Sequence, residues 1–438
     1  MKEYQKCAKE MLAFINESPT CFHAVDNIRK MLEEQGFEER RETEDWMLEA
    51  GKGYFVVRND SSVIAFRIPL KIEETFVEKD PAISGFHIVT THGDSPSFKV
   101  KEAPETVSEG HYVRLNTEKY GGMIQSAWLD RALSVAGRLA LRGKNGTETR
   151  LVNIDKDLLV IPNVAIHMNR DMNKGVEYNP QVDLLPLFAD CGDGKKKNAL
   201  MKRVAKAAEV KAEEILAYDL FLYVREKGRL FGDDNEFVLS PRLDDLQCVY
   251  SSVKAFLAAE PAKYVNVCAV FDNEEVGSGT RQGADSTFLE DVLWRIGESL
   301  KLTRSNYLRL VAGSFLISAD NAHAVHPNHP EKADPTNRPY LNGGIVIKYH
   351  GSQKYTTDAV SAAKMKELCE RAGVPFQTYA NRSDIPGGST LGNISTAHVS
   401  VASVDIGLPQ LAMHSAVETA GVRDTLYAVK VLTAFYEE

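Results

Sequence analysis

Residues 262–286 read AKYVNVCAVFDNEEVGSGTRQGADS, and this stretch indicates both a fold class and a place for chemistry. Its first part is an apolar run that ends at Phe271 and has the length and composition of a buried strand. Two neighbouring carboxylates, Glu274 and Glu275, follow the run, and the glycines after them allow a tight turn from strand to helix. The stretch therefore predicts a strand that delivers acidic side chains at its C-terminal end.

The alternation of apolar runs and amphipathic segments continues on both sides of this stretch. Helical patterns lie at 244–259, 287–300, 357–372 and 415–436. The strand-like runs between them are NYLRLVAGSFLIS (306–318), GGIVIKYH (343–350) and HVSVASVDI (398–406). Such alternation is typical of βαβ units. We therefore expect an α/β fold with a mixed, mostly parallel sheet covered by helices.

The beginning and the middle of the chain differ in texture. Two helical patterns, broken at Ser18-Pro19-Thr20, come first. They are followed by strand-like runs at GYFVVRND (53–60), SSVIAFRIPL (61–70) and Phe86–Thr91. The middle holds short strands and a lysine-rich helical pattern over 199–217. We predict a catalytic α/β domain formed by residues 1–95 and 238–438, interrupted by a smaller β-rich domain at 96–237, because 438 residues exceed one ordinary core.

Composition excludes several classes of protein. The formal net charge of -9 argues against a protein that binds nucleic acid or an anionic membrane. The six cysteines form no CxxC pair, a pattern typical of reduced thiols and not of a disulfide framework or a thiolate metal site. The N-terminal segment lacks the apolar region of a secretory signal, and no run approaches the roughly 18 apolar residues of a membrane span. We therefore expect a cytoplasmic protein.

Histidines and carboxylates follow the predicted strands. His92 and Asp94 come after Phe86–Thr91, Asp320 comes after the run that ends at Ser318, and His414 comes shortly after the run that ends at Ile406. Ligands of open α/β sheets bind at this edge, beyond the carboxyl ends of the strands. Asp244 and Asp245, in SPRLDD, lie instead at the start of a predicted helix.

Two histidines and several carboxylates without cysteine are the ligands that a pair of zinc, cobalt or manganese ions requires. An aspartate can bridge two cations with its two oxygens, and Asp244 is the better candidate. Residues i and i+2 of an extended backbone point the same way, so Asp94 can hold the far ring nitrogen of His92. Of Glu274 and Glu275, one can ligate a metal while the other takes a proton from the water that the metals activate.

Each signal alone also has an ordinary explanation. An Asp-Asp pair at a helix start is usually a cap, and a Glu-Glu pair is usually a solvated surface pair. His323, His326 and His329, in NAHAVHPNH, could be polar residues of a surface loop. The joint placement of all these residues is what indicates a metal centre.

Six segments stand together in an order and spacing that resemble a known family. They are SPTCFHAV (18–25), HGDSPSFKVK (92–101), SPRLDD (240–245), DNEEVGSGTRQGADS (272–286), SADNAHAVHPN (318–328) and QLAMHS (410–415). The chain is similar, from near Ser18 to His414, to the aspartyl aminopeptidase and aminopeptidase I family of two-zinc metallopeptidases. The resemblance implies an α/β catalytic domain interrupted by a β-rich domain that serves in dimerisation or as a lid.

The resemblance also implies roles for individual residues. The implied metal ligands are His92, Asp244, Glu275, Asp320 and His414. Asp244 would bridge two divalent ions, most simply zinc, with Glu274 as the general base and Asp94 orienting His92. His167, in VAIHMNR, matches a histidine that the family contributes from a neighbouring subunit, within a tetrahedral dodecamer built from dimers. One departure is Asp245, where many relatives carry Asn, and its added charge could shift the affinity for metal.

The implied substrates are peptides with a free N-terminus, from which the first residue is released. Lys348, in GGIVIKYH, stands where members that prefer Asp or Glu carry a lysine, and His323 is a second candidate substrate-binding residue. Other members prefer Leu or other neutral residues, and Lys348 could also be a lysine that faces solvent at a strand end.

Two other functions remain open. A two-metal amidase or deacylase on a related fold would use similar ligands, although the match extends to segments outside the minimal metal set. A shell or binding protein that has lost catalysis would have no reason to keep every ligand and the base.

Overall fold

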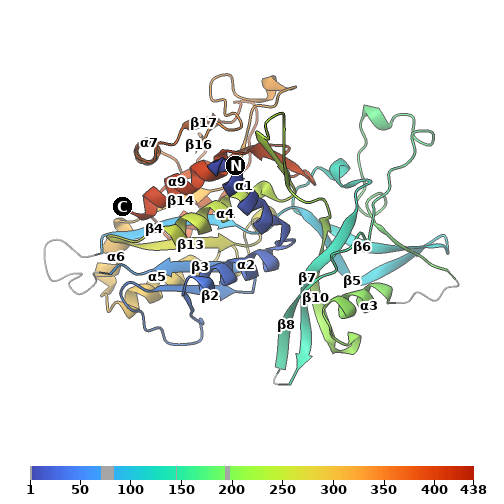
Figure 1. Ribbon diagram of the computed structural model, residues 1–438, viewed down its shortest axis with the longest axis horizontal. Coiled ribbons are helices and arrows are strands. Elements are labelled where there is room, and N and C mark those ends of the chain that lie inside the picture. The colour runs from blue at the N-terminus through green and yellow to red at the C-terminus, as the bar shows by residue number, and fades with distance from the viewer. Residues whose placement is uncertain (1, 71–82, 145, 193–197) are drawn as a thin grey trace.

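The computed structural model describes residues 2–70, 83–144, 146–192 and 198–438. The chain forms a large α/β lobe and a smaller β lobe that lie side by side (Figure 1). The α/β lobe contains both chain termini, whereas the β lobe is formed by the middle of the chain. Within the described residues, no helix combines the length and the apolar character that are needed to span a bilayer.

The α/β lobe is organised by a nine-stranded sheet in the order β1-β2-β3-β13-β4-β14-β18-β16-β17. In that order its strands are β1 (Glu38–Glu39), β2 (Gly53–Arg58), β3 (Ser62–Arg67), β13 (Tyr264–Phe271), β4 (Gly85–His92), β14 (Phe315–Ala319), β18 (Ala402–Gly407), β16 (Ile345–Tyr349) and β17 (Phe376–Ala380). The four central strands β13, β4, β14 and β18 run parallel, while β3 and β16 are antiparallel to their inner neighbours. The predicted mixed α/β fold is therefore confirmed.

Helices cover both faces of this sheet. One face packs against α1 (Glu3–Asn16), α2 (Cys21–Glu34), α4 (Leu243–Ala258), α7 (Ala359–Ala372) and α9 (Asp424–Tyr436). The other face packs against α5 (Phe288–Ser299), α6 (Arg304–Ala312) and α8 (Leu391–His398). Because side chains of a strand alternate between faces, Cys268 and Val270 of β13 enter the first core while Val267 and Ala269 enter the second. Both faces are buried, which explains why the central strands are continuous apolar runs.

The β lobe is built on a six-stranded antiparallel sheet in the order β8-β7-β10-β5-β6-β9. Its strands are β5 (Ser97–Ser108), β6 (Tyr112–Tyr120), β7 (Leu133–Gly143), β8 (Gly146–Asn153), β9 (Leu187–Asp190) and β10 (Ile215–Val224), and α3 (Ala199–Ala207) packs beside them. All six strands lie inside 96–237, and their core is distinct from the two cores of the α/β lobe, although Ala416 and Val417 also contribute to it. This separation supports the predicted domain boundaries, which remain a proposal.

A small third sheet joins segments that are distant in sequence. It consists of β11 (Arg229–Phe231), β12 (Phe237–Ser240), β20 (Glu418–Gly421), β19 (Pro409–Leu411) and β15 (Ala322–His323). The sheet lies where the chain returns from the β lobe, so it ties the returning segment to the C-terminal part of the α/β lobe.

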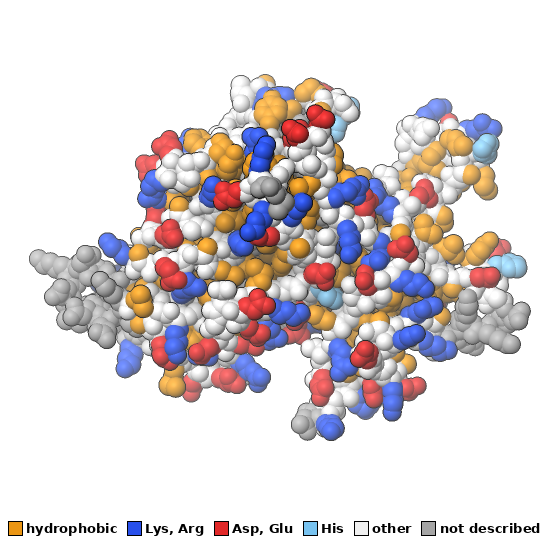
Figure 2. Space-filling view, in the orientation of Figure 1, with side chains coloured by type: hydrophobic (Ala, Val, Ile, Leu, Met, Phe, Trp, Pro, Cys, Tyr) orange, Lys and Arg blue, Asp and Glu red, His pale blue; other side chains and the backbone are white. Residues whose placement is uncertain are grey.

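The segment between β8 and β9 projects from the β lobe at the upper right of Figure 1. Hydrophobic side chains gather on this arm (Figure 2), among them Val164, Ile166 and Met168, which are 50%, 44% and 82% exposed. We call residues 162–182 the projecting arm. Exposed apolar side chains in such a group indicate a surface that meets another protein.

Three predicted elements have different limits in the structure. The lysine-rich helix expected over 199–217 ends at Ala207, because Glu209 adopts a left-handed conformation and Ile215 already begins β10. The run 306–318, expected as one strand, begins as helix α6 and becomes strand β14 only at Phe315. The helix expected over 415–436 begins at Asp424, because residues 418–421 pair with β12 and β19.

Candidate metal centre

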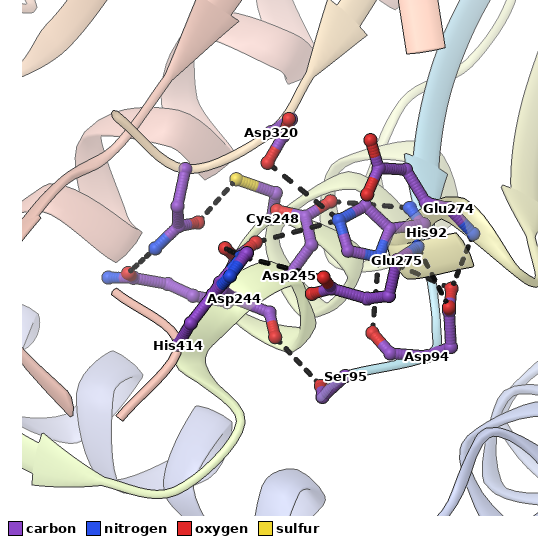
Figure 3. A network of polar contacts seen from close by, with 12 residues as sticks. His92, Asp94, Ser95, Asp244, Asp245, Cys248, Glu274, Glu275, Asp320 and His414 are labelled. Carbon is purple, nitrogen blue, oxygen red and sulfur yellow. Dashed lines mark hydrogen bonds and ion pairs between the residues drawn. The ribbon is translucent and has the colours of Figure 1, made fainter. Parts of the chain in front are cut away.

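Three parallel strands end side by side at the centre of the large sheet, and each delivers side chains to one site (Figure 3). His92 is the last residue of β4, and Asp320 directly follows β14. Phe271, the last residue of β13, lies in register with His92, so the following short 3-10 turn η4 (Glu274–Val276) stands over the same edge. The position expected from the strand pattern is therefore where these residues meet.

The other two side chains reach the site from outside the large sheet. His414 lies in the connection between β19 and β20 with a φ of 64°. Asp244 stands in the first turn of α4, where its φ and ψ of -81° and 111° are not helical, and its peptide bond to Asp245 is cis. The Asp244 carboxylate lies between the rings of His92 and His414 (Figure 3).

Asp244 stands between the two histidines. Its Oδ1 lies 3.5 Å from Nε2 of His92, and its Oδ2 lies 3.3 Å from Nε2 of His414. Asp320 Oδ1 is 3.8 Å from the same His92 nitrogen, and Glu275 Oε2 is 3.5 Å from the same His414 nitrogen. The side chains thus form two overlapping triplets, His92–Asp244–Asp320 and Asp244–Glu275–His414, each with its ligand atoms within 4.8 Å of one another. Glu274 forms a third such group with His92 and Glu275.

Hydrogen bonds orient both imidazoles so that Nε2 faces the carboxylates. Nδ1 of His92 is 3.1 Å from the backbone oxygen of Asp94 and 3.4 Å from its Oδ1. Nδ1 of His414 is 2.6 Å from the backbone oxygen of Gly122. A partner on Nδ1 fixes the tautomer that leaves Nε2 available as a ligand.

The donor set fits two divalent cations. Asp244 is 3% exposed, and among the described residues neither its Oδ1 nor Oε1 of Glu275 has a hydrogen-bond partner. Burial and the charge of Asp244 raise the pKa of Glu275 well above its usual value. Grouped carboxylates without compensating cations are costly to bury, and oxygen and imidazole ligands suit zinc, cobalt and manganese.

The histidines supply positive charge to this cluster when no metal is bound. Burial alone lowers the pKa of His92, but the carboxylates of Asp244 and Asp320 outweigh this effect and hold that pKa well above its usual value. Burial likewise lowers the pKa of His414, but Asp244 and Glu275 outweigh it and raise that pKa to about 10. Both rings are therefore in the positively charged imidazolium form, and a metal ion must displace one of the two ring protons in order to bind.

Glu274 has the properties of an acid–base group. Burial, with Asp320 and Asp94 as the main neighbouring negative charges, raises its pKa to about 7. A carboxyl group with such a pKa can take up and release a proton near neutral pH.

Two groups that the sequence did not single out, Glu418 and Tyr120, support the centre together with Asp245. Glu418, only 2% exposed, accepts hydrogen bonds from the backbone N–H groups of Asp244 (3.0 Å) and His414 (2.7 Å). Tyr120, from β6 of the other lobe, donates to Asp94 Oδ2 at 2.6 Å. Burial and the charge of Asp94 raise the pKa of Tyr120 well above its usual value, so the hydroxyl remains a donor. The side chain of Asp245 accepts a hydrogen bond from the His92 N–H at 3.3 Å.

The metal centre opens into a cavity of about 500 Å³. Its lining includes Lys348, His323, Tyr355, Tyr379 and Thr390. Lys348 is 2% exposed, with Nζ 3.2 Å from the backbone oxygen of Asn321 and 3.7 Å from Asp320 Oδ2, so it does not face solvent. His323 reaches the cavity wall, with its ring centroid 6.0 Å from that of Tyr379, whereas His326 and His329 lie in the exposed loop beyond it.

The structure does not bring His167 to the other predicted residues. It lies exposed in the projecting arm and is not among the residues that line the cavity beside the metal centre of its own chain.

Known proteins are similar to this chain over nearly its whole length. The family model described as aminopeptidase I zinc metalloprotease (M18) matches residues 14–436. The chain is 50% identical over 439 residues to a probable M18 family aminopeptidase 2 of Clostridium novyi (strain NT), covering 100% of both proteins. A probable M18 family aminopeptidase 2 of Pseudomonas aeruginosa (strain UCBPP-PA14) is 40% identical over 433 residues, with 97% of each protein covered.

Solved structures give the same result. A chain in the cryo-EM structure of the Ape4 and Nbr1 complex is 36% identical and superposes with a TM-score of 0.93, covering 99% of this chain and 86% of that one. The mApe1 dodecamer of S. cerevisiae is 27% identical with a TM-score of 0.85, covering 99% and 97%. The chain therefore belongs to the M18 family of zinc metalloproteases and is an aminopeptidase, a hydrolase of peptide bonds.

Proposed function

We propose that this aminopeptidase uses two divalent cations, zinc in the simplest case, and favours peptides whose first residue is Asp or Glu. The observation that carries the proposal is the position of Asp244, whose two oxygens each face a different histidine. His92 and Asp320 would complete one cation site, and Glu275 and His414 the other.

When bound, two such cations would lower the pKa of a water molecule at the site and polarise the carbonyl group of the first peptide bond. Glu274 takes the proton from the attacking water and returns it to the leaving amine, a task that its pKa of about 7 suits. Asp94 holds His92 in place and accepts a hydrogen bond from the backbone N–H of Glu274 at 3.1 Å. The same carboxylate therefore positions both the base Glu274 and the ligand His92. The surrounding carboxylates favour a substrate that carries a free, positively charged α-amino group.

Lys348 supports the preference for an acidic first residue. Its ammonium group lies in the cavity beside the metal centre, where it is removed from water. Asp320 is its near counter-charge at 3.7 Å, and the same carboxylate would serve a cation. A buried ammonium group whose counter-charge is shared with a cation is stabilised by the carboxylate of an acidic substrate side chain. A neutral substrate side chain cannot provide this stabilisation, so it binds less favourably.

We also propose that the active form is an assembly in the cytoplasm. The S. cerevisiae relative forms a dodecamer, and the projecting arm exposes Val164, Ile166 and Met168 as a surface for a second copy of this chain. His167 lies within that surface and would enter a neighbour's site, where its ring can donate a hydrogen bond to the substrate carbonyl oxygen.

The test is hydrolysis of Asp-, Glu- and Leu-anilides by purified protein, before chelation and after zinc, cobalt or manganese is added back. Cleavage that chelation abolishes and metal restores, faster for Asp and Glu than for Leu, supports the whole proposal. Faster cleavage of the Leu substrate would instead assign a neutral preference. Release of N-acyl groups without cleavage of any anilide would favour a deacylase, and two bound ions without either activity would favour a catalytically silent shell.

A further inference from the structure

A short segment of the β lobe reaches the metal centre of the α/β lobe. Residues 120–122, Tyr-Gly-Gly, leave the end of β6 and pass beside the strand ends that hold the ligands. We call these residues the Tyr-Gly-Gly segment. Each of its members meets a different residue of the site, namely Asp94, Glu275 and His414.

Tyr120 holds the carboxylate on which several site groups depend. Asp94 Oδ2 accepts its hydroxyl at 2.6 Å, while the two oxygens of Asp94 also accept the backbone N–H groups of Glu274 at 3.1 Å and Glu275 at 3.2 Å. Asp94 Oδ1 lies 3.4 Å from Nδ1 of His92. The Tyr120 hydroxyl in turn accepts from the side chain of Asn273 at 2.9 Å, next to Glu274 in the chain. The Tyr120 hydroxyl therefore fixes Asp94, which orients the ligand His92. It also fixes the turn that carries the base Glu274.

Gly121 allows the backbone to approach Glu275 closely. Its φ is 77°, and a Cβ at this position would lie 3.1 Å from Cβ and 3.4 Å from Oε2 of Glu275. Gly122 completes the contact, because its backbone oxygen faces Nδ1 of His414 at 2.6 Å. A larger residue at 121 would press on one ligand and move the carbonyl that orients another.

We propose that the Tyr-Gly-Gly segment positions the metal centre from the β lobe, and that Tyr120 is a positioning residue for His92 and Glu274 acting through Asp94. The inference rests on the proposed two-cation site. Groups that orient ligands typically change metal affinity or activity by about 10–100-fold when they are removed. The β lobe is thus part of the construction of the catalytic centre.

The first test replaces single hydroxyl groups of the same β lobe. Tyr120→Phe removes the bond to Asp94, and Tyr218→Phe is the matched control, because its hydroxyl donates to the backbone oxygens of Lys101 and Glu102 away from the site. Titration of metal-free protein with cobalt(II), followed by visible absorption, reports affinity and ligand geometry without any substrate. We expect Tyr120→Phe to change the cobalt spectrum and to lower cobalt affinity or kcat by about 10–100-fold, with KM little changed. Equal behaviour of the two variants would overturn the proposal.

A double-mutant cycle shows whether Tyr120 acts through Asp94. In an Asp94→Asn background, Tyr120→Phe should cause little further loss, because the two residues act as one unit. If the losses caused by the two substitutions were fully additive, this result would contradict an action of Tyr120 through Asp94. If the wild-type protein binds cobalt but cleaves no peptide, the proposed function fails while the spectrum still tests the positioning role.

Gly121→Ala gives a second test that does not depend on tyrosine. Gly110→Ala is its control, since Gly110 has a similar φ of 70° with no atom within 4 Å of an added Cβ, so backbone strain is matched. We expect Gly121→Ala alone to weaken one of the two cobalt sites by about 10-fold or more. Cobalt binding as tight as in the Gly110→Ala variant would contradict the role of the segment.

Discussion

His92 and His414 face carboxylates on their Nε2 atoms and oxygen acceptors on their Nδ1 atoms, so both rings are surrounded by groups that favour a proton. The pKa of His414 is raised to about 10, and that of His92 is also raised. At neutral pH both rings are therefore protonated in metal-free protein, and a cation competes with those protons.

This competition predicts the direction of a pH effect. Zinc binding should release protons, and zinc affinity should rise as the pH is increased from about 6 to 8, because fewer protons then oppose the metal. Calorimetry in buffers of different ionisation enthalpy measures the number of protons released. Binding without proton release, or affinity that falls as the pH rises, would contradict the protonated state of the rings.

Glu274 can be separated from the ligands by an isosteric change. Glu274→Gln keeps the size of the side chain but cannot accept the proton of water, so we expect kcat to fall by about 10²–10⁴-fold. Zinc content measured by atomic absorption should stay at the wild-type level, since Glu274 lies outside the two triplets that share Asp244. Retention of wild-type turnover would remove Glu274 from the role of base.

Lys348 determines side-chain preference in our proposal. Lys348→Leu removes the buried ammonium, so cleavage of Asp and Glu substrates should fall relative to Leu substrates by at least about 10-fold in kcat/KM. Lys366→Leu, at a half-buried position of α7 that does not line the cavity, is a control for the loss of one positive charge. An unchanged ratio of aspartyl to leucyl hydrolysis, at equal zinc content, would exclude Lys348 from the specificity pocket.

The sequence predicted which residues meet at the centre but not how they are held. His92, Asp320 and Glu275 follow apolar runs, and a strand pattern carries that information. Asp244 looks like a helix cap in sequence, and only the distorted first turn of α4 shows that it faces both histidines. Glu418 and Tyr120 have no such signal, because their partners are backbone groups and an aspartate far away in the chain.

At the scale of elements, the register of β13 and β4 aligns the site, since Phe271 pairs with His92 and both strands then end. Strand prediction succeeded for these buried runs because both faces are apolar. It failed for 306–318, where Thr303 caps the helix α6 by accepting the N–H of Asn306 and Gly313 follows its end. A short helix that precedes a strand is hard to recognise from sequence, because few of its residues are buried and the helical periodicity is weak. In α6 only Tyr307 and Leu310 are buried.

The cap of α7 gives a stability prediction at this scale. The side chain of Asp358 accepts the backbone N–H groups of Val360 and Ser361, and α7 packs on the sheet beside β16 and β18. Asp358→Ala should lower the free energy of unfolding by about 1 kcal/mol, with zinc content unchanged. Denaturant unfolding of metal-loaded protein measures the difference, and Asp358→Asn, which retains a capping oxygen, should lose less. Equal stability of the Ala variant and the wild type would show that the cap contributes little.

At the scale of the whole molecule, our proposal makes the projecting arm the link between assembly and activity. Met168→Glu places a charge on the most exposed apolar residue of the arm, so the assembly should dissociate and activity should fall together. Val360→Glu is the control, since Val360 is 79% exposed on α7 and lies outside the arm. Light scattering and anilide hydrolysis on the same fractions check both effects. Full activity in a dissociated protein would separate catalysis from assembly and remove His167 from the site.

The ligands of the metal centre are spread over most of the chain, from His92 to His414, and the support of Glu418 comes later still. A ribosome therefore exposes the first histidine long before it has synthesised the second, and the earlier part of the chain folds with an incomplete set of ligands. The order of the ligands along the polypeptide therefore leaves the metal centre incomplete until His414 has been synthesised.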